Sequence, residues 1–470
     1  MMIRLPRNPK EKEKIGFWLL NPASKFESLL LTLFFLLLPT QLGKHFWPAF
    51  TIVTGIRIDY LSPTLYVTDL LLILLVGSVI FRWVKVLKNS KGQSQKSKIQ
   101  LKSKKFIIFL VFSFSLLVYN ILFASRPLLS LYGFIKLCEY VFLGFYLAKT
   151  IHSKFQLQQI TLLFSISAIF ESVLAILQYI NQGSLNGIFY FFGERTFTGA
   201  TPGIANASIN GALILRPYAT FSHPNVLAGY LLVAIILVWS FLLKTNRLGV
   251  RIIAIFSLLV SSIALLLTYS RVAILLWVVL LFIQLFRLGF RKVKTPKLIV
   301  IFVVIAASAL LFVSFLPLMH DLYFRFMQTS LTDESVVERK ELLAASWTMT
   351  RQHPLVGVGL LNFIPALAPL QKPLPLNLYL QPVHNIFVLV AAETGIIGFG
   401  LFFGLLAKTL VRIRNTPRGT GQESRVKKTF FVMVLVILIT GMFDHFWLTL
   451  QQGQLLFATI IGLSWAKYNV

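Results

Sequence analysis

Residues 224–294 read PNVLAGYLLVAIILVWSFLLKTNRLGVRIIAIFSLLVSSIALLLTYSRVAILLWVVLLFIQLFRLGFRKVK. The stretch contains three apolar runs, each close to the roughly 20 residues that cross the hydrocarbon core of a bilayer as a helix. Lys and Arg crowd the first connection, and they follow the last run, whereas the short turn between the second and third runs carries only Arg271. This alternation follows the positive-inside rule and predicts a chain that passes repeatedly through a membrane.

The same pattern continues in both directions along the chain. It predicts an all-α polytopic membrane protein with twelve helices, at about 26–42, 64–84, 106–123, 128–149, 158–180, 224–243, 250–268, 272–287, 298–316, 384–407, 429–446 and 452–467. Of the 45 Lys and Arg residues, 33 fall in one set of connections, 11 fall in the opposite set and Lys136 lies inside a span. We therefore expect both termini in the cytoplasm and the protein in the cytoplasmic (inner) membrane.

The predicted parts are a basic cytoplasmic N-terminus (1–25) and a first bundle (26–180) that contains the basic, low-complexity linker 85–105. A second bundle (181–316) begins with an outer loop at 181–222. A large outer loop (317–383) and the C-terminal helices (384–470) follow. Within the large loop, Ser330, Thr332 and Asp333 are candidate N-caps, and Val336, Leu343 and Trp347 follow at helical spacing. An amphipathic helix on the outer membrane surface is predicted there.

Composition excludes several classes of protein. The chain is 56% hydrophobic with a net charge of +29. Since the basic residues flank the spans, they favour contacts with anionic membrane lipids over nucleic acid. The single cysteine, Cys138, excludes an intrachain disulfide and a cysteine-based metal site. No cleavable signal peptide is evident at the N-terminus.

Three polar residues at predicted outer helix ends are candidates for chemistry: Arg216, Arg271 and His384. Charges near a membrane are costly and tend to persist with a partner or a function. Each also has a structural explanation. The arginines can snorkel to lipid head groups, and a histidine at a helix start can act as a cap. His223 and Asn225 can likewise cap the helix that begins near Pro224.

Four segments together resemble the O-antigen ligase/polymerase family of membrane glycosyltransferases. They are RPYATFSHPNVLAGYL (216–231), LTYSRVAILL (267–276), RKELLAASWTMTRQHPLVGVGLLNF (339–363) and HNIFVLVAAETGIIG (384–398). Each motif is weak alone, but their order and shared placement are typical of the family. Family members commonly have Asn where this chain has His223.

The resemblance implies roles for particular residues. Arg216 and Arg271 would hold the diphosphate of a polyprenyl-linked glycan donor, and His384 would activate the acceptor hydroxyl. Binding roles are expected for Arg339, His223, Asn225 and Asn385. The acceptor would be a glycan, a lipid A core or a protein hydroxyl. Arginines stabilise charge on a departing diphosphate, and the sequence shows no carboxylate-rich metal motif, so we expect no metal and no cofactor. Attack from the face opposite the diphosphate would invert the anomeric centre.

Acidic residues inside the spans need a separate explanation. Glu139 follows Lys136 by three residues, so a same-helix ion pair is expected. Glu171 has no evident local partner, and Glu393 lies too deep to orient His384, so we expect it to pair across helices, with close packing at Gly395 and Gly398. An alternative function is transport of small anions or lipid-linked sugars. That class is expected to show an inverted repeat and broken helices, and neither is evident in the sequence.

Overall fold

The computed structural model describes residues 24–90, 115, 118–209, 212–242, 245, 247–289, 334–370, 380–415 and 422–468. The predicted helix 298–316, most of the helix 106–123, the N-terminal segment 1–23 and the candidate caps Ser330, Thr332 and Asp333 lie outside the described residues.

The protein is an all-α polytopic membrane protein with small strand pairs. Six described helices are long and apolar enough to cross a membrane: α3 (Val67–Ser90, apolar over Val67–Lys85), α5 (Pro127–Thr150), α6 (Lys154–Asn181), α7 (Pro224–Phe241), α8 (Leu248–Leu267) and α14 (Ile386–Arg414). The remaining described α-helices are α2 (Lys25–Leu37), α9 (Arg271–Gly289), α12 (Glu334–Gln352), α13 (Phe363–Leu367), α15 (Gln422–Gly441), α16 (Phe446–Thr449) and α17 (Gln451–Trp465). The count of twelve spans stays a prediction.

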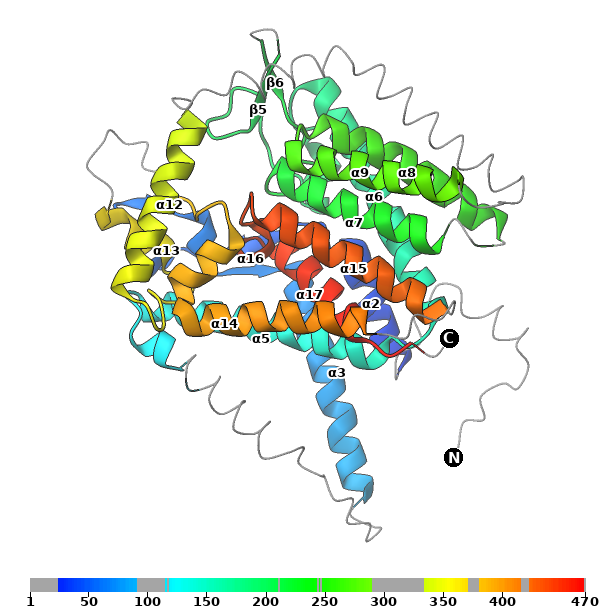
Figure 1. Cartoon of the computed structure of the whole chain (residues 1–470), viewed down its shortest axis with the longest axis horizontal. Coiled ribbons are helices and arrows are strands. Elements are labelled where there is room, and N and C mark those ends of the chain that lie inside the picture. The colour runs from blue at the N-terminus through cyan, green and yellow to red at the C-terminus, as the bar shows by residue number, and fades with distance from the viewer. Residues whose placement is uncertain are drawn as a thin grey trace.

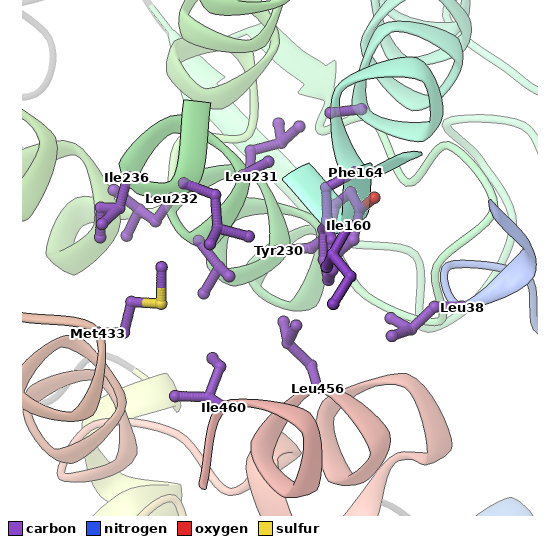
Figure 2. Close-up of a cluster of buried hydrophobic side chains, with 14 of the residues drawn as sticks. Leu38, Ile160, Phe164, Tyr230, Leu231, Leu232, Ile236, Met433, Leu456 and Ile460 are labelled. Carbon is purple, nitrogen blue, oxygen red and sulfur yellow. The ribbon is translucent and has the colours of Figure 1, made fainter. Parts of the chain in front are cut away.

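Helices α6, α8, α9, α15 and α17 pack around α7. Figure 1 shows α5, α8, α9, α14 and α15 crossing the view, with α12 and α13 gathered at one end of the bundle. The core is built from α6, α7, α15 and α17, whose side chains meet in Figure 2, among them Phe164, Tyr230, Met433 and Leu456. Because α7 is apolar on every side, it is the most deeply buried of the candidate spans.

One end of this bundle carries the irregular segments, and we call it the loop end. Helices α7, α9 and α14 begin there, and α6 and α8 finish there. The prediction of a helix over 26–42 is wrong at its C-terminal part, because α2 ends at Leu37. At about 1.5 Å per residue its 13 residues are too short to span a bilayer. Short antiparallel strands follow: β1 (Gly43–His45) with β4 (Thr64–Tyr66), and β2 (Ile52–Val53) with β3 (Ile56–Arg57). A third pair, β5 (Asn206–Ile209) with β6 (Ala212–Leu215), forms a hairpin within the predicted loop 181–222.

A break interrupts α14 at Gly395, whose φ is +62°. Close packing at this glycine was expected and is confirmed, but the break was not predicted and the packing partner is a loop. The segment 354–359 fills the break: Val358 N donates to Ala392 O at 2.9 Å, and Ile396 N donates to Pro354 O at 2.8 Å. A Cβ on Gly357 would lie 2.3 Å from the Glu393 carbonyl carbon, and one on Gly395 would lie 2.3 Å from that of Leu355. The two glycines therefore let the loop and the helix interlock.

Candidate functional site

Three helices begin at predicted site residues at the loop end. His223 is the N-cap of α7, Asn385 is the N-cap of α14, and Arg271 is the first residue of α9. The Asn385 side-chain oxygen accepts hydrogen bonds from Phe387 N and Val388 N. The partial positive charge of helix N-termini favours anions, so this end of the bundle suits a phosphate-bearing ligand.

Arg216 connects these helices. Its Nε donates to the Thr268 carbonyl at 2.7 Å, and Nη2 donates to Asn225 Oδ1 at 2.7 Å. Thr268 stands three residues before Arg271, so both predicted arginines belong to the same corner of the bundle. Asn225 in turn donates to Asp444 Oδ2 at 2.7 Å. The separation of the two guanidinium groups stays a prediction.

Two histidine rings pack together beside this network. The centroids of the His384 and His445 rings are 5.2 Å apart, and those of the Tyr60 and His445 rings are 5.4 Å apart. Burial lowers the pKa of His384, and Arg339 lowers it further, although Asp444 opposes both. Burial also lowers the pKa of His445 to about 4, again against Asp444. Both imidazoles are therefore neutral at neutral pH. The Nδ1 of His384 is buried and has no hydrogen-bond partner among the described residues.

His223 has a different role in the geometry. Its Nδ1 accepts the backbone N–H of Asn225 at 3.1 Å, so the neutral ring carries its proton on Nε2. Burial, together with the charge of Arg216, lowers the pKa of this ring to about 3. His223 is therefore a hydrogen-bond donor rather than a base, and its side chain lines the large cavity described below.

Buried polar residues of α6 hold the loop that carries Arg216 and His223. Glu171 accepts from Thr220 N at 3.0 Å and from Thr220 Oγ1 at 2.9 Å. Gln178 Oε1 accepts from Tyr218 N and Ala219 N. Ala219 has a φ of +51°, a conformation that costs an L-residue about 1–2 kcal/mol. The partner of Glu171, unassigned from sequence, is therefore this strained loop.

Glu393 likewise binds a backbone amide, here at the start of α13. Its carboxylate accepts from Phe363 N at 3.4 Å, and Asn120 donates to the Glu393 carbonyl at 3.0 Å. The Glu393 carboxylate therefore pairs with a backbone amide of another segment, where a partner on another helix was expected.

The described part of the chain forms an open cavity of about 1430 Å³ that runs along the bundle from the loop end. At the loop end its wall includes Arg195, His223, Asp59 and Tyr60. Further along it becomes apolar, between α5, α14 and α17, with Phe145, Val141, Leu401, Leu405, Phe457 and Ile461. Of the site residues predicted from sequence, His223 is the one on this wall, and Arg216, Arg271, Arg339, Asn225, His384 and Asn385 stand outside the lining.

Midway along the cavity, Lys136 forms ion pairs with two carboxylates. Its Nζ lies 3.1 Å from Glu139 Oε2, which confirms the expected pair, and 2.8 Å from Asp69 Oδ2. The second carboxylate was missed because it comes from another helix. Lys136 also lies over the rings of Tyr66 and Tyr140.

Arg339 lies on α12, exposed, and its charge reaches both His384 and His445. The face of α12 that packs inward carries Leu342 and Met349, whereas Leu343 and Trp347 are exposed. Placement of this helix on the membrane surface stays a prediction.

The sequence analysis assigned no role to four residues of this region: Asp59, Tyr60, Arg195 and Asp444. Arg195 was detectable as a charge in an outer loop. Tyr60 and Asp59 precede a predicted span in a segment without a recognisable motif. Within the described residues there is no group of three His, Cys, Asp or Glu side chains arranged to hold a metal ion.

Comparison with known proteins gives one match. No curated protein matches the chain. Residues 256–403 match the family model described as O-Antigen ligase. This segment is less than half of the chain and contains three of the four motifs in full. It includes Arg271, Arg339, His384 and the interlock between residues 354–359 and α14. Residues 256–403 are therefore similar to the O-antigen ligase family.

Proposed function

We propose that this protein ligates or polymerises a glycan carried on a polyprenyl diphosphate, at the outer face of the cytoplasmic membrane. The proposed transfer needs no metal and inverts the anomeric centre. The match of residues 256–403 to the O-antigen ligase family model supports glycan transfer in general. The observation that carries the finer proposal is the shape of the cavity, which is polar and carries charged side chains beside His223 and Arg195 and is apolar towards the other end. A lipid-linked glycan has the same division between a charged head and a hydrocarbon tail.

In this proposal the diphosphate lies at the corner formed by α7, α9 and α14. Arg216 and Arg271 supply fixed positive charge, and the helix N-termini add to it. His223 donates from Nε2 to a phosphate oxygen. Negative charge grows on the diphosphate as the glycosidic bond breaks, so these groups stabilise the transition state more than the bound donor. The binding roles of Arg339, Asn225 and Asn385 belong to the same proposal.

His384 is the proposed general base. A neutral imidazole can accept the proton of the acceptor hydroxyl as its oxygen attacks the anomeric carbon. The packing of its ring against His445 and the charge of Asp444 are suited to stabilise the imidazolium that forms. Attack from the face opposite the diphosphate inverts the anomeric centre, and the diphosphate leaves with the electron pair of the broken bond.

The test uses the purified full chain in lipid vesicles with a synthetic polyprenyl-diphosphate oligosaccharide and a hydroxyl acceptor. We expect new glycoside in the presence of EDTA, with inverted anomeric configuration by NMR. Movement of the intact donor across the vesicle membrane without transfer would instead identify a transporter, the alternative function. Loss of transfer in EDTA that Mg²⁺ restores would contradict the metal-independent mechanism.

A further inference from the structure

A turn of exposed aromatic residues lies beside α6. Residues Gly187–Phe192, sequence GIFYFF, form the 3₁₀ turn η3. Ile188 is 67% exposed, Tyr190 57% and Phe191 71%. Adjacent large apolar side chains with this exposure mark a surface that contacts something other than water.

The turn is held rigidly in place. Thr40 Oγ1 donates to Phe192 O at 2.6 Å, and Gln41 Nε2 donates to Gly193 O at 3.2 Å. The Glu194 carboxylate accepts from Leu185 N at 2.8 Å and from Asn186 N at 2.7 Å. These bonds satisfy backbone groups that would otherwise be costly away from water, so the turn is compatible with a hydrocarbon environment.

The contacts of η3 place it alongside the spanning part of α6. The rings of Phe189 and Phe192 pack on Phe170, with centroids 6.4 and 5.3 Å away. Phe170 lies eleven residues before the end of α6 at Asn181, which is about 16 Å along a helix. That end is level with the turn between α8 and α9, because the hydroxyls of Tyr179 and Tyr269 are 3.1 Å apart.

The apolar surface of α6 is continuous with the turn. Val173, Leu177 and Ile180 follow Phe170 at helical spacing and are all exposed. They form a lipid-facing stripe on the side of the helix that meets η3. Half of a hydrocarbon core is about 15 Å, so the stripe and η3 cover the same depth of one leaflet.

We propose that η3 inserts Ile188, Tyr190 and Phe191 among the lipid acyl chains of the leaflet at the loop end. Tyr190 and Gly193 also line the cavity. The inserted turn therefore forms part of the boundary between the membrane and the cavity. This inference does not depend on the reaction proposed above, and its test needs no activity.

The single cysteine of the chain makes the test direct. Cys138 lies exposed on α5, so a nitroxide attached to it gives a lipid reference. In a Cys138→Ser background, Phe191→Cys and Ile188→Cys carry the label in η3. Thr54→Cys, in the exposed turn between β2 and β3, gives an aqueous reference. The full-length variants are reconstituted in phosphatidylethanolamine–phosphatidylglycerol vesicles, and collision of each label with oxygen and with a water-soluble nickel chelate is measured by power saturation.

We expect both η3 labels to favour oxygen over the nickel chelate, as the Cys138 label does. Two positions are used so that a folding defect in one variant leaves the other informative. Preference for the nickel chelate at either position, as at Thr54→Cys, would overturn the proposal. Protection of both positions from oxygen and nickel would also overturn it, because it would mean that another protein or a second copy covers the turn.

Discussion

Replacement of Arg216 by lysine tests whether the hydrogen-bond network at the loop end controls the reaction. The side chain makes two charge-assisted hydrogen bonds of 2.7 Å, to Thr268 O and to Asn225 Oδ1, from two different nitrogens of one planar fork. A lysine ammonium keeps the charge but lacks the fork. We expect it to lose one of the two bonds. A hydrogen bond to a charged group contributes about 1.5–3 kcal/mol. If that loss raises the activation free energy by the same amount, the rate falls roughly 10- to 150-fold.

The assay is glycan transfer by purified Arg216→Lys in vesicles, with thermal unfolding measured on the same samples. Arg351→Lys is the matched control, because Arg351 is exposed on α12 and lies over Trp347. A double-mutant cycle with Asn225→Ala then isolates the contact: if the network carries the effect, the two losses are not additive. Normal transfer by Arg216→Lys would refute the reasoning. An equal loss in the Arg351 control would show that the effect is not specific to the network.

The other predictions concern the base, the pH response, the broken helix and the orientation. His384→Ala should lower transfer about 10²- to 10⁴-fold while donor binding measured by calorimetry persists; near-normal turnover would remove it as the base. Since the pKa of His384 is lowered, the acid limb of kcat/KM should lie below pH 6.5, and a limb above that value would contradict the assignment. The pKa of His445 in the folded protein is about 4, so the unfolded chain binds more protons than the folded one between pH 6.5 and 4. The melting temperature should therefore fall as the pH is lowered through that window, and it should fall less in His445→Gln. Gly395→Ala should destabilise the protein by at least about 1–2 kcal/mol from its left-handed backbone alone, whereas Gly400→Ala on the same helix, with open space around it, should not. A reporter fused within 85–105 should read as cytoplasmic, and an external reading would reverse the whole orientation.

Local signals explain which parts were predictable. Pro224 after His223 indicated the start of α7, and the spacing of Lys136 and Glu139 indicated their ion pair. Both depend on residues a few positions apart. The family-model match covers the segment with the motifs at 339–363 and 384–398, which the sequence analysis had used.

The end of α2 had a local signal, because only Leu38 extends the apolar run before Pro39, and the predicted helix 26–42 continued past that proline. Two other failures share a physical cause, which is hydrogen bonding between distant parts of the chain. The break at Gly395 depends on backbone groups of residues 354–359. The pairing of Asp444 with Asn225 joins positions 219 residues apart, which no local pattern could indicate.

The buried polar residues that bind backbone amides also set rules for building chimaeras of this chain with related proteins. Loop 181–222 carries Arg216 and His223, yet Glu171 and Gln178 of α6 hold its strained segment in shape. If that loop alone were exchanged, its backbone N–H groups would have to donate to whatever side chains the recipient helix provides. A graft that starts at residue 154, at the beginning of α6, moves the loop together with the groups that hold it. Exchange boundaries in this chain therefore belong at the far ends of the helices, one span away from the residues whose specificity is being transferred.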